Sequence, residues 1–94
     1  MEVDIRGLIE KDIDSLIESA TIDRLVVWFK EMFPIRSLED SLFGFIVGAV
    51  FARFLGLLEE RGRKPTNAEV KEFMELIERR AMEIKGKIKL ALNK

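Results

Sequence analysis

The sequence predicts an all-α fold: a four-helix antiparallel bundle-like domain with a long central apolar helix and a long C-terminal helix. Apolar residues recur at three- and four-residue spacing in successive segments, as they do on one face of a helix. No segment shows the alternation of apolar and polar residues that is typical of a strand. A chain of 94 residues has room for one hydrophobic core, so we expect residues 1–94 to form a single helical domain.

The first two helices are predicted over residues 4–19 and 22–33. In the first, apolar residues occupy one face and acidic residues the opposite face. Thr21 is placed to cap the second helix, since a threonine side chain can accept a hydrogen bond from the first turn. Pro34 is expected to end this helix at Phe33, because the residue before a proline is disfavoured in helical geometry.

The third helix is predicted over residues 38–60. Ser37 is followed three residues later by Asp40, which resembles a capping box with Asp in place of the usual Glu or Gln. The segment is apolar almost all round, and this is typical of a central helix or of a membrane span.

The fourth helix is predicted over residues 66–92, with Thr66 and Glu69 forming a capping box at its start. Its apolar residues alternate at spacings of four and three, which indicates packing against another helix at a shallow angle. This seam comprises Val70, Met74, Ile77, Ala81, Ile84, Ile88 and Ala91. Gly86 interrupts the seam, so an early end of the helix at this position is an alternative.

Small residues recur at every fourth position along the predicted third helix. An interior glycine costs about 1 kcal/mol relative to alanine, so a line of glycines suggests the close approach of another helix. We favour a helix of the same chain, with a second copy of the chain as the alternative. A membrane span over residues 41–58 ranks third, because the other helices carry apolar faces suited to covering this one in water. The expected helix-packing or oligomer interface comprises Val27, Trp28, Gly44, Gly48, Phe51, Ala52 and Gly56.

Two charged residues fall within apolar sectors of their helices. Asp12 lies on the apolar side of the first helix, and Arg53 lies on the third. A buried charge is expensive unless it is paired, so a buried Asp12–Arg53 ion pair is one hypothesis. The alternative is that the Arg53 side chain extends to solvent from the edge of its helix.

The composition argues against an enzyme. The chain has no histidine and no cysteine, which removes the commonest general base, the commonest metal ligand and the thiol nucleophile. No glycine-rich phosphate-binding loop follows a strand. The glutamates at 69, 72, 75 and 78 are interpreted as a solvated helix face. We therefore expect no catalytic residue, no metal site and no cofactor.

Charge is distributed unevenly along a chain whose formal net charge is only −1. Acidic residues dominate the first 41 residues and basic residues dominate from 53 onward. The candidate phosphate contacts are Arg61, Arg63, Lys64, Lys85, Lys87 and Lys89. The sequence pI of 5.6 is low for a dedicated nucleic-acid binder, so pairing of these cations with acidic residues nearby is the favoured interpretation.

These observations predict a small, non-enzymatic helical protein–protein interaction module that self-associates, most simply as a dimer. The alternative is a nucleic-acid-associated protein that uses the basic loop 61–64 and the basic C-terminus, and a membrane-anchored helical protein is third. The partner protein is not specified by the sequence. Charged residues interrupt the N-terminus before any apolar stretch, so we expect no signal peptide and a cytoplasmic location. Abundant charge with only two amide side chains suggests a thermophilic source.

Overall fold

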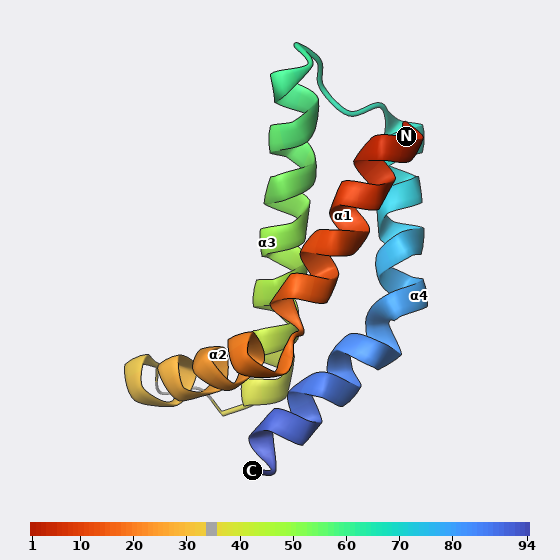
Figure 1. The fold of residues 1–94 in the computed structure, drawn as a ribbon. Helices are drawn as coiled ribbons and strands as arrows, with labels where there is room; N and C mark the ends of the chain where they lie inside the picture. Colours follow the sequence, from red (N-terminus) through yellow and green to blue (C-terminus); the bar gives the residue numbers. More distant parts are fainter. Residues whose placement is uncertain (34–35) are drawn as a thin grey trace.

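The computed structural model describes residues 1–33 and 36–94, and over these residues it confirms an all-α fold without strands (Figure 1). The helices are α1 (Val3–Leu16), α2 (Ser19–Met32), α3 (Leu38–Glu60) and α4 (Asn67–Leu92). α3 contacts each of the other three helices, which confirms the prediction of a central apolar helix. α1 and α4 both run antiparallel to α3 (Figure 1).

The boundary between the first two helices differs from the prediction. α1 ends at Leu16 and α2 begins at Ser19, so Thr21 lies inside α2 and does not cap it. Glu18 occupies the N-cap position and makes no side-chain capping hydrogen bond. The short bend buries both Ile17 and Ile22, and the free energy of burying two isoleucines exceeds that of one cap. The predicted effect of Pro34 falls outside the described residues.

The capping prediction is confirmed in full for α4 and in part for α3, where Ser37 caps the helix but the reciprocal hydrogen bond to Asp40 is not formed among the described residues. The Ser37 hydroxyl accepts a hydrogen bond from the Asp40 backbone N–H at 3.4 Å. Thr66 and Glu69 form the full capping box, with both reciprocal hydrogen bonds at 3.1 Å. α4 continues through Gly86, so the alternative of an early end is wrong.

The core lies where α1, α3 and α4 converge and extends to α2. Its aromatic centre is a cluster of Phe51, Phe54 and Phe73, in which Phe54 and Phe73 stack with ring centroids 5.3 Å apart. This packing corrects the predicted seam of α4, because Phe73 is buried whereas the neighbouring Met74 is 62% exposed. Both residues are apolar and adjacent, so the periodicity alone does not distinguish them.

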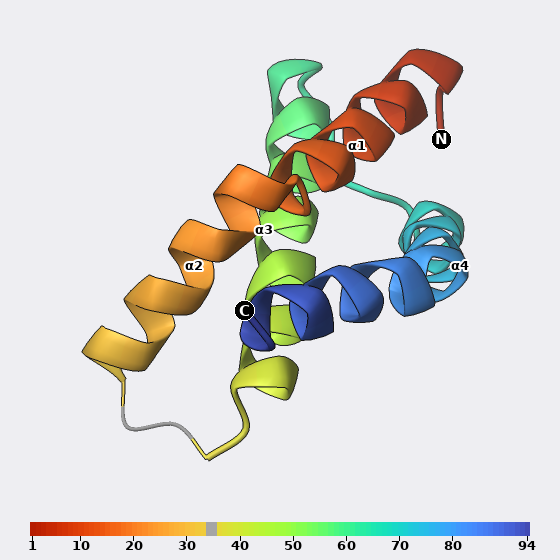
Figure 2. The ribbon, with the colours of Figure 1, turned by 60° about the horizontal axis from the view of Figure 1, so that its bottom comes forward.

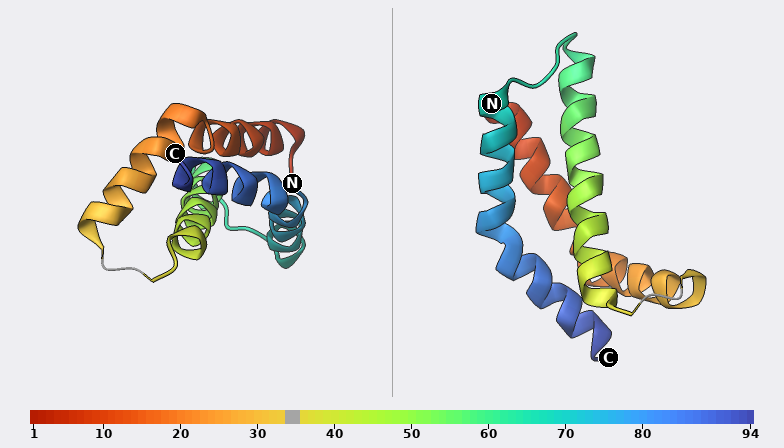
Figure 3. Two further views of the ribbon diagram at one scale, coloured as in Figure 1. Left: turned by 90° about the horizontal axis from the view of Figure 1, so that it is seen from below. Right: turned by 180° about the vertical axis from the view of Figure 1, so that it is seen from behind.

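α2 departs from the bundle and projects from the N-terminal end of α3 as an arm (Figures 1 and 3). Phe29 holds the arm to α3, with its ring centroid 5.4 Å from that of Phe45. The C-terminal half of α4 packs against the arm in the views of Figures 2 and 3, and Ile22 and Ala91 are both buried in the core. α1, α3 and α4 therefore form the antiparallel bundle, and α2 lies at an angle to α3 (Figure 1).

Arg80 links α1 to α4 although the backbones of these helices are not in direct contact. Its guanidinium donates to Asp14 Oδ1 at 2.6 Å and to the Glu10 carbonyl oxygen at 3.3 Å. Glu83, one turn further along α4, accepts from the same guanidinium at 2.9 Å. These charge-assisted hydrogen bonds join two helices across a distance that a shorter side chain does not span.

Candidate interaction surface

The small-residue stripe of α3 faces away from the rest of the chain. Gly44, Gly48 and Ala52 are exposed and Gly56 is half-buried. A Cβ atom added at any of the three glycines would meet nothing within 4 Å among the described residues. The favoured prediction that a helix of the same chain packs on this stripe is therefore wrong. The opposite side of α3 carries larger residues, whose burial removes more apolar surface from water: Leu42, Ile46, Val50, Phe54, Leu57 and Leu58.

Two larger apolar side chains border the stripe. Phe45 is 45% exposed and Leu55 is 36% exposed. We call this surface the outer face of α3, and it consists of Gly44, Phe45, Gly48, Ala52, Leu55 and Gly56. Between Asp40 and Arg53 the helix contains no charged residue. The outer face is thus an uncharged, unpartnered surface along most of the longest apolar helix.

The arm carries further exposed apolar side chains. Val27, Trp28 and Met32 are each more than half exposed, and Phe33, which follows the last turn, is 49% exposed. Val27 and Trp28 thus lie uncovered on the surface of the chain. Phe29 connects the arm with the outer face, since its ring centroid lies 5.5 Å from that of Phe33 and 5.4 Å from that of Phe45.

The sequence predicts Phe51 as part of the same interface, but in the structure Phe51 packs against α4. It is half-buried, with its ring centroid 5.1 Å from that of Phe73 on α4. Helical geometry places position 51 on the side of α3 that faces α4, well away from Ala52. Phe51 therefore contributes to helix packing within the chain rather than to the outer face.

The hypothesis of a buried Asp12–Arg53 pair is wrong. Arg53 is exposed and Asp12 is only half-buried. Neither side chain takes part in an ion pair within residues 1–33 and 36–94. The aliphatic stem of an arginine at the edge of a helix can cover apolar surface while its guanidinium stays in water, as the alternative predicted.

The two arginines of the basic loop 61–64 form ion pairs with acidic residues of the same chain. Arg61 pairs with Asp4. Arg63 donates to Glu69 Oε1 at 2.6 Å and to Glu2 Oε1 at 2.7 Å, so one guanidinium joins the starts of α1 and α4. This pairing agrees with the favoured interpretation of the loop cations. Lys64 forms no ion pair among the described residues.

These ion pairs shift the pKa values of the groups involved. The hydrogen bonds from Arg63, followed by that from the Thr66 backbone, lower the pKa of Glu69 to about 2. The pKa of Glu2 is lowered by the same guanidinium, and the pKa of Arg63 is raised above its ordinary value by both carboxylates. Sequence reasoning identified Glu69 as a capping residue but missed its pairing with Arg63, which is six positions away through a loop.

The remaining candidate phosphate contacts lie at the other end of the molecule, on the C-terminal half of α4 (Figure 1). Lys85 Nζ lies 4.9 Å from the centroid of the Phe43 ring. Lys89 pairs with Glu39 at 3.8 Å, whereas Lys87 makes no ion pair within the described part of the chain. The two basic clusters therefore do not converge on one surface.

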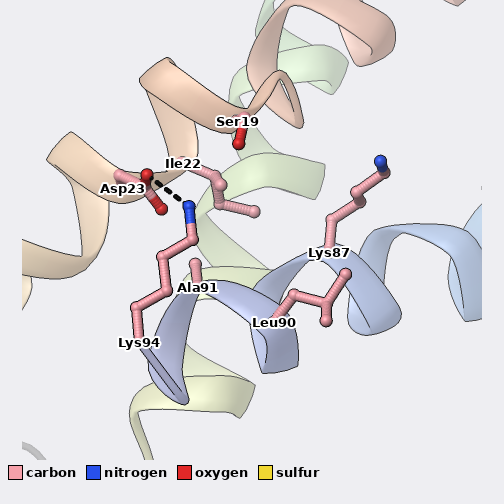
Figure 4. Close-up of a pocket in the computed structure, with 7 residues that line it drawn as sticks. All are labelled: Ser19, Ile22, Asp23, Lys87, Leu90, Ala91 and Lys94. Carbon is pink, nitrogen blue, oxygen red and sulfur yellow. Dashed lines mark hydrogen bonds and ion pairs between the residues drawn. The ribbon is translucent and has the colours of Figure 1, made fainter.

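A small open pocket of about 260 Å³ lies between the start of α2 and the end of α4 (Figure 4). Asp23 Oδ2 accepts a hydrogen bond from Lys94 Nζ at 2.7 Å across its mouth. Asp23 Oδ1 is buried and accepts no hydrogen bond from the described residues. Ser19 and Lys87 also border the pocket, and apolar side chains from both helices form the rest of its lining.

Within residues 1–33 and 36–94, no three acidic side chains come together as a group that could hold a metal ion. Glu69 is committed to its capping box and to Arg63. Comparison of the chain with models of known protein families, with curated proteins and with solved structures finds no match. The candidate site is therefore defined by its surface alone, and that surface is the outer face of α3 with the adjoining arm.

Proposed function

We propose that this protein is a small, non-enzymatic helical interaction module that self-associates through the outer face of α3. The observation that carries the proposal is that this face is apolar and uncharged, and that a Cβ atom added at any of its glycines would meet nothing within 4 Å among the described residues. Large exposed apolar surfaces on small proteins commonly mark interaction sites. A symmetric dimer is the commonest arrangement in which a protein covers such a surface with a second copy of itself.

The size of the exposed surface suits a dimer. Phe33 and Phe45 are each about half exposed and Trp28 is 64% exposed, which leaves on the order of 100 Å² of each side chain in water. With Met32, Leu55 and the small residues, the apolar surface amounts to roughly 600 Å², against the ~800 Å² per partner of a standard protein interface. Phe29 connects part of this apolar surface, because its ring contacts both Phe33 and Phe45.

The glycines add a second argument. Each interior glycine of α3 lowers helix stability by about 1 kcal/mol relative to alanine, yet none of them relieves a contact with residues 1–33 or 36–94. A second helix that approaches α3 closely would supply the compensating contacts, since small residues allow helix backbones to pack at short distance.

The nucleic-acid alternative has less support. Arg61 and Arg63 are paired with acidic side chains, and the basic residues of α4 lie at the opposite end of the molecule. Binding to phosphates would have to displace Asp4, Glu2 and Glu69 from the loop arginines. A steep loss of binding as salt rises would be the signature of this alternative.

A membrane-anchored protein is the other alternative. By length and composition α3 could cross a membrane, and about a third of its most apolar stretch is buried in the fold. The core helix of a globular protein passes the same test, because apolar residues on its inner side count equally. We favour the second-copy interpretation and a cytoplasmic location, and the composition supports a thermophilic source.

The test is the molar mass of the purified chain in detergent-free buffer, measured by light scattering over a range of concentrations. We expect a mass near twice 10.9 kDa that falls toward one subunit on dilution. Ala52→Leu should shift the equilibrium to the monomer, because it places a bulky side chain on the outer face without disturbing the core. Met82→Leu is the matched control, since Met82 is 87% exposed on α4, away from this face.

A monomer at every concentration would overturn the proposal. So would recovery of the protein only in detergent-extracted membranes, which would favour the membrane-anchored alternative. Co-purification of nucleic acid that is released by salt would favour the nucleic-acid alternative.

A further inference from the structure

We infer that the occupant of the outer face is the α3 helix of a second copy, running antiparallel and crossing between Ala52 and Gly56. In this arrangement Arg53 of each copy faces Glu59 and Glu60 of the other. The inference rests on the proposed self-association and adds the orientation and the charged contacts of the interface.

The charges of α3 carry the argument. Arg53, Glu59 and Glu60 are exposed, and none of them takes part in an ion pair among the described residues. Arg53 and Glu60 are seven residues apart, which places them on the same flank of the helix two turns from one another. Glu59 lies in line with the outer face, one turn beyond its last residue, since it is seven residues from Ala52 and three from Gly56.

Symmetry decides between the two orientations. In a parallel pair related by a two-fold axis, equivalent positions lie at the same level, so the two copies of Glu59 would face each other as like charges. In an antiparallel pair that crosses between positions 52 and 56, Arg53 lies within about 6–8 Å along the helix axis of the partner carboxylates. A long arginine side chain spans this distance, and the two-fold axis generates the contact twice.

The position of the crossing follows from the small residues and from the arm. A crossing midway between Ala52 and Gly56 places each against the other in the partner, so the closest approach involves the smallest side chains. The arm projects from the N-terminal half of α3, where Phe45 contacts Phe29. The second α3 helix therefore covers α3 from Gly48 onward, and Phe45 and the exposed residues of the arm lie beside this crossing rather than under it.

Cysteine cross-linking tests the orientation directly, because the natural chain contains no cysteine. We expect a disulfide between Ala52→Cys and Gly56→Cys when the two purified variants are mixed and oxidised. Each variant alone should cross-link less efficiently. Equivalent Cα atoms are offset by about 6 Å along the helix axis and lie about 7–8 Å apart, at or beyond the ~7 Å limit of a disulfide, whereas Cα atoms of positions 52 and 56 at one level lie about 3–5 Å apart. Efficient cross-linking of Ala52→Cys with itself, which a parallel pair or an antiparallel pair centred on position 52 would give, would overturn the inference.

A charge exchange tests the contacts. Arg53→Glu should weaken the dimer about 2- to 30-fold, since two exposed ion pairs are lost together. Adding Glu59→Arg and Glu60→Arg in the same chain should restore the dimer, which a merely structural role for Arg53 does not predict. Lys64→Glu, which changes an exposed cation outside the crossing, is the control.

The outcomes separate the two proposals. A wild-type monomer in light scattering would overturn the self-association and the inference with it. A dimer with homotypic cross-links at position 52, or one that is indifferent to charge exchange, would leave self-association standing and overturn only the antiparallel crossing between Ala52 and Gly56.

Discussion

Replacing exposed glycines of α3 by alanine should stabilise the individual chain. Gly44 and Gly48 lie in the interior of a 23-residue helix, and an added Cβ would meet nothing within 4 Å. Alanine is favoured over glycine in a helix interior by about 0.8–1.0 kcal/mol. We therefore expect Gly44→Ala with Gly48→Ala to raise the free energy of unfolding by about 2 kcal/mol.

The measurement is denaturant unfolding followed by circular dichroism, at a protein concentration low enough that the chain is monomeric. Gly62→Ala is the matched control. It also replaces glycine by alanine, but at a residue whose backbone φ angle is +71°. Only glycine adopts this left-handed conformation without strain, so this variant should lose about 1 kcal/mol instead. The two variants are thus expected to differ in sign.

A loss of stability for the double variant in the monomer would refute the reasoning, because it would mean that the chain itself covers the stripe. Gly56→Ala extends the test to the proposed interface. Its monomer should gain about 1 kcal/mol, whereas its dimer should dissociate more readily, because a methyl group stands at the crossing point. A tighter dimer for this variant would contradict close packing at Gly56.

Four further predictions concern the core, the ion pairs and thermal stability. Phe73→Ala should lower the free energy of unfolding by about 3–5 kcal/mol in urea, whereas Met74→Ala should change it by less than about 0.5 kcal/mol. Similar losses for the two variants would indicate that Met74 is buried, as the seam predicted from the sequence requires. Because the pKa of Glu69 is lowered to about 2, its contribution to stability is complete above about pH 4.5 and is lost as the pH falls toward 2. Glu69→Gln should flatten that part of the acid-unfolding profile, and an unchanged profile would argue against the Arg63 pairing. Arg80→Met should lower stability by about 1–2 kcal/mol, less so in high salt, and a salt-independent loss would point to packing instead. The wild-type chain should remain folded near ~90 °C in a thermal melt, and a midpoint of 45–65 °C would contradict a thermophilic source.

Local patterns in the sequence are sufficient to predict the helices. The Thr66–Glu69 capping box and the Ser37 cap involve residues three positions apart, so they form irrespective of how the helices pack. The start of α3 at Leu38 and its end at Glu60 agree with the predicted range. The start of α2 was missed because the burial of Ile17 and Ile22, a tertiary effect, outweighed the local preference of Thr21 for a cap.

The candidate surface was recognised in the sequence only in part. The sequence identifies the stripe of α3 and the residues Val27 and Trp28 as an interface, but it favours a helix of the same chain as the occupant of the stripe. α3 is apolar almost all round, so its pattern does not specify which side faces inward. Phe51 illustrates the same difficulty, since it lies next to Ala52 in the sequence and on a different side of the folded helix.

By itself, the sequence determined the all-α class, the extent of the long helices and the absence of histidine and cysteine chemistry. These properties depend on composition and on contacts between residues close in the chain. Only the tertiary structure decided that Phe73 rather than Met74 is buried, that Arg63 joins Glu2 to Glu69, and that the small-residue stripe faces outward. Each of these outcomes depends on how residues distant in the sequence pack in the limited volume of the core. The local sequence pattern does not specify that packing.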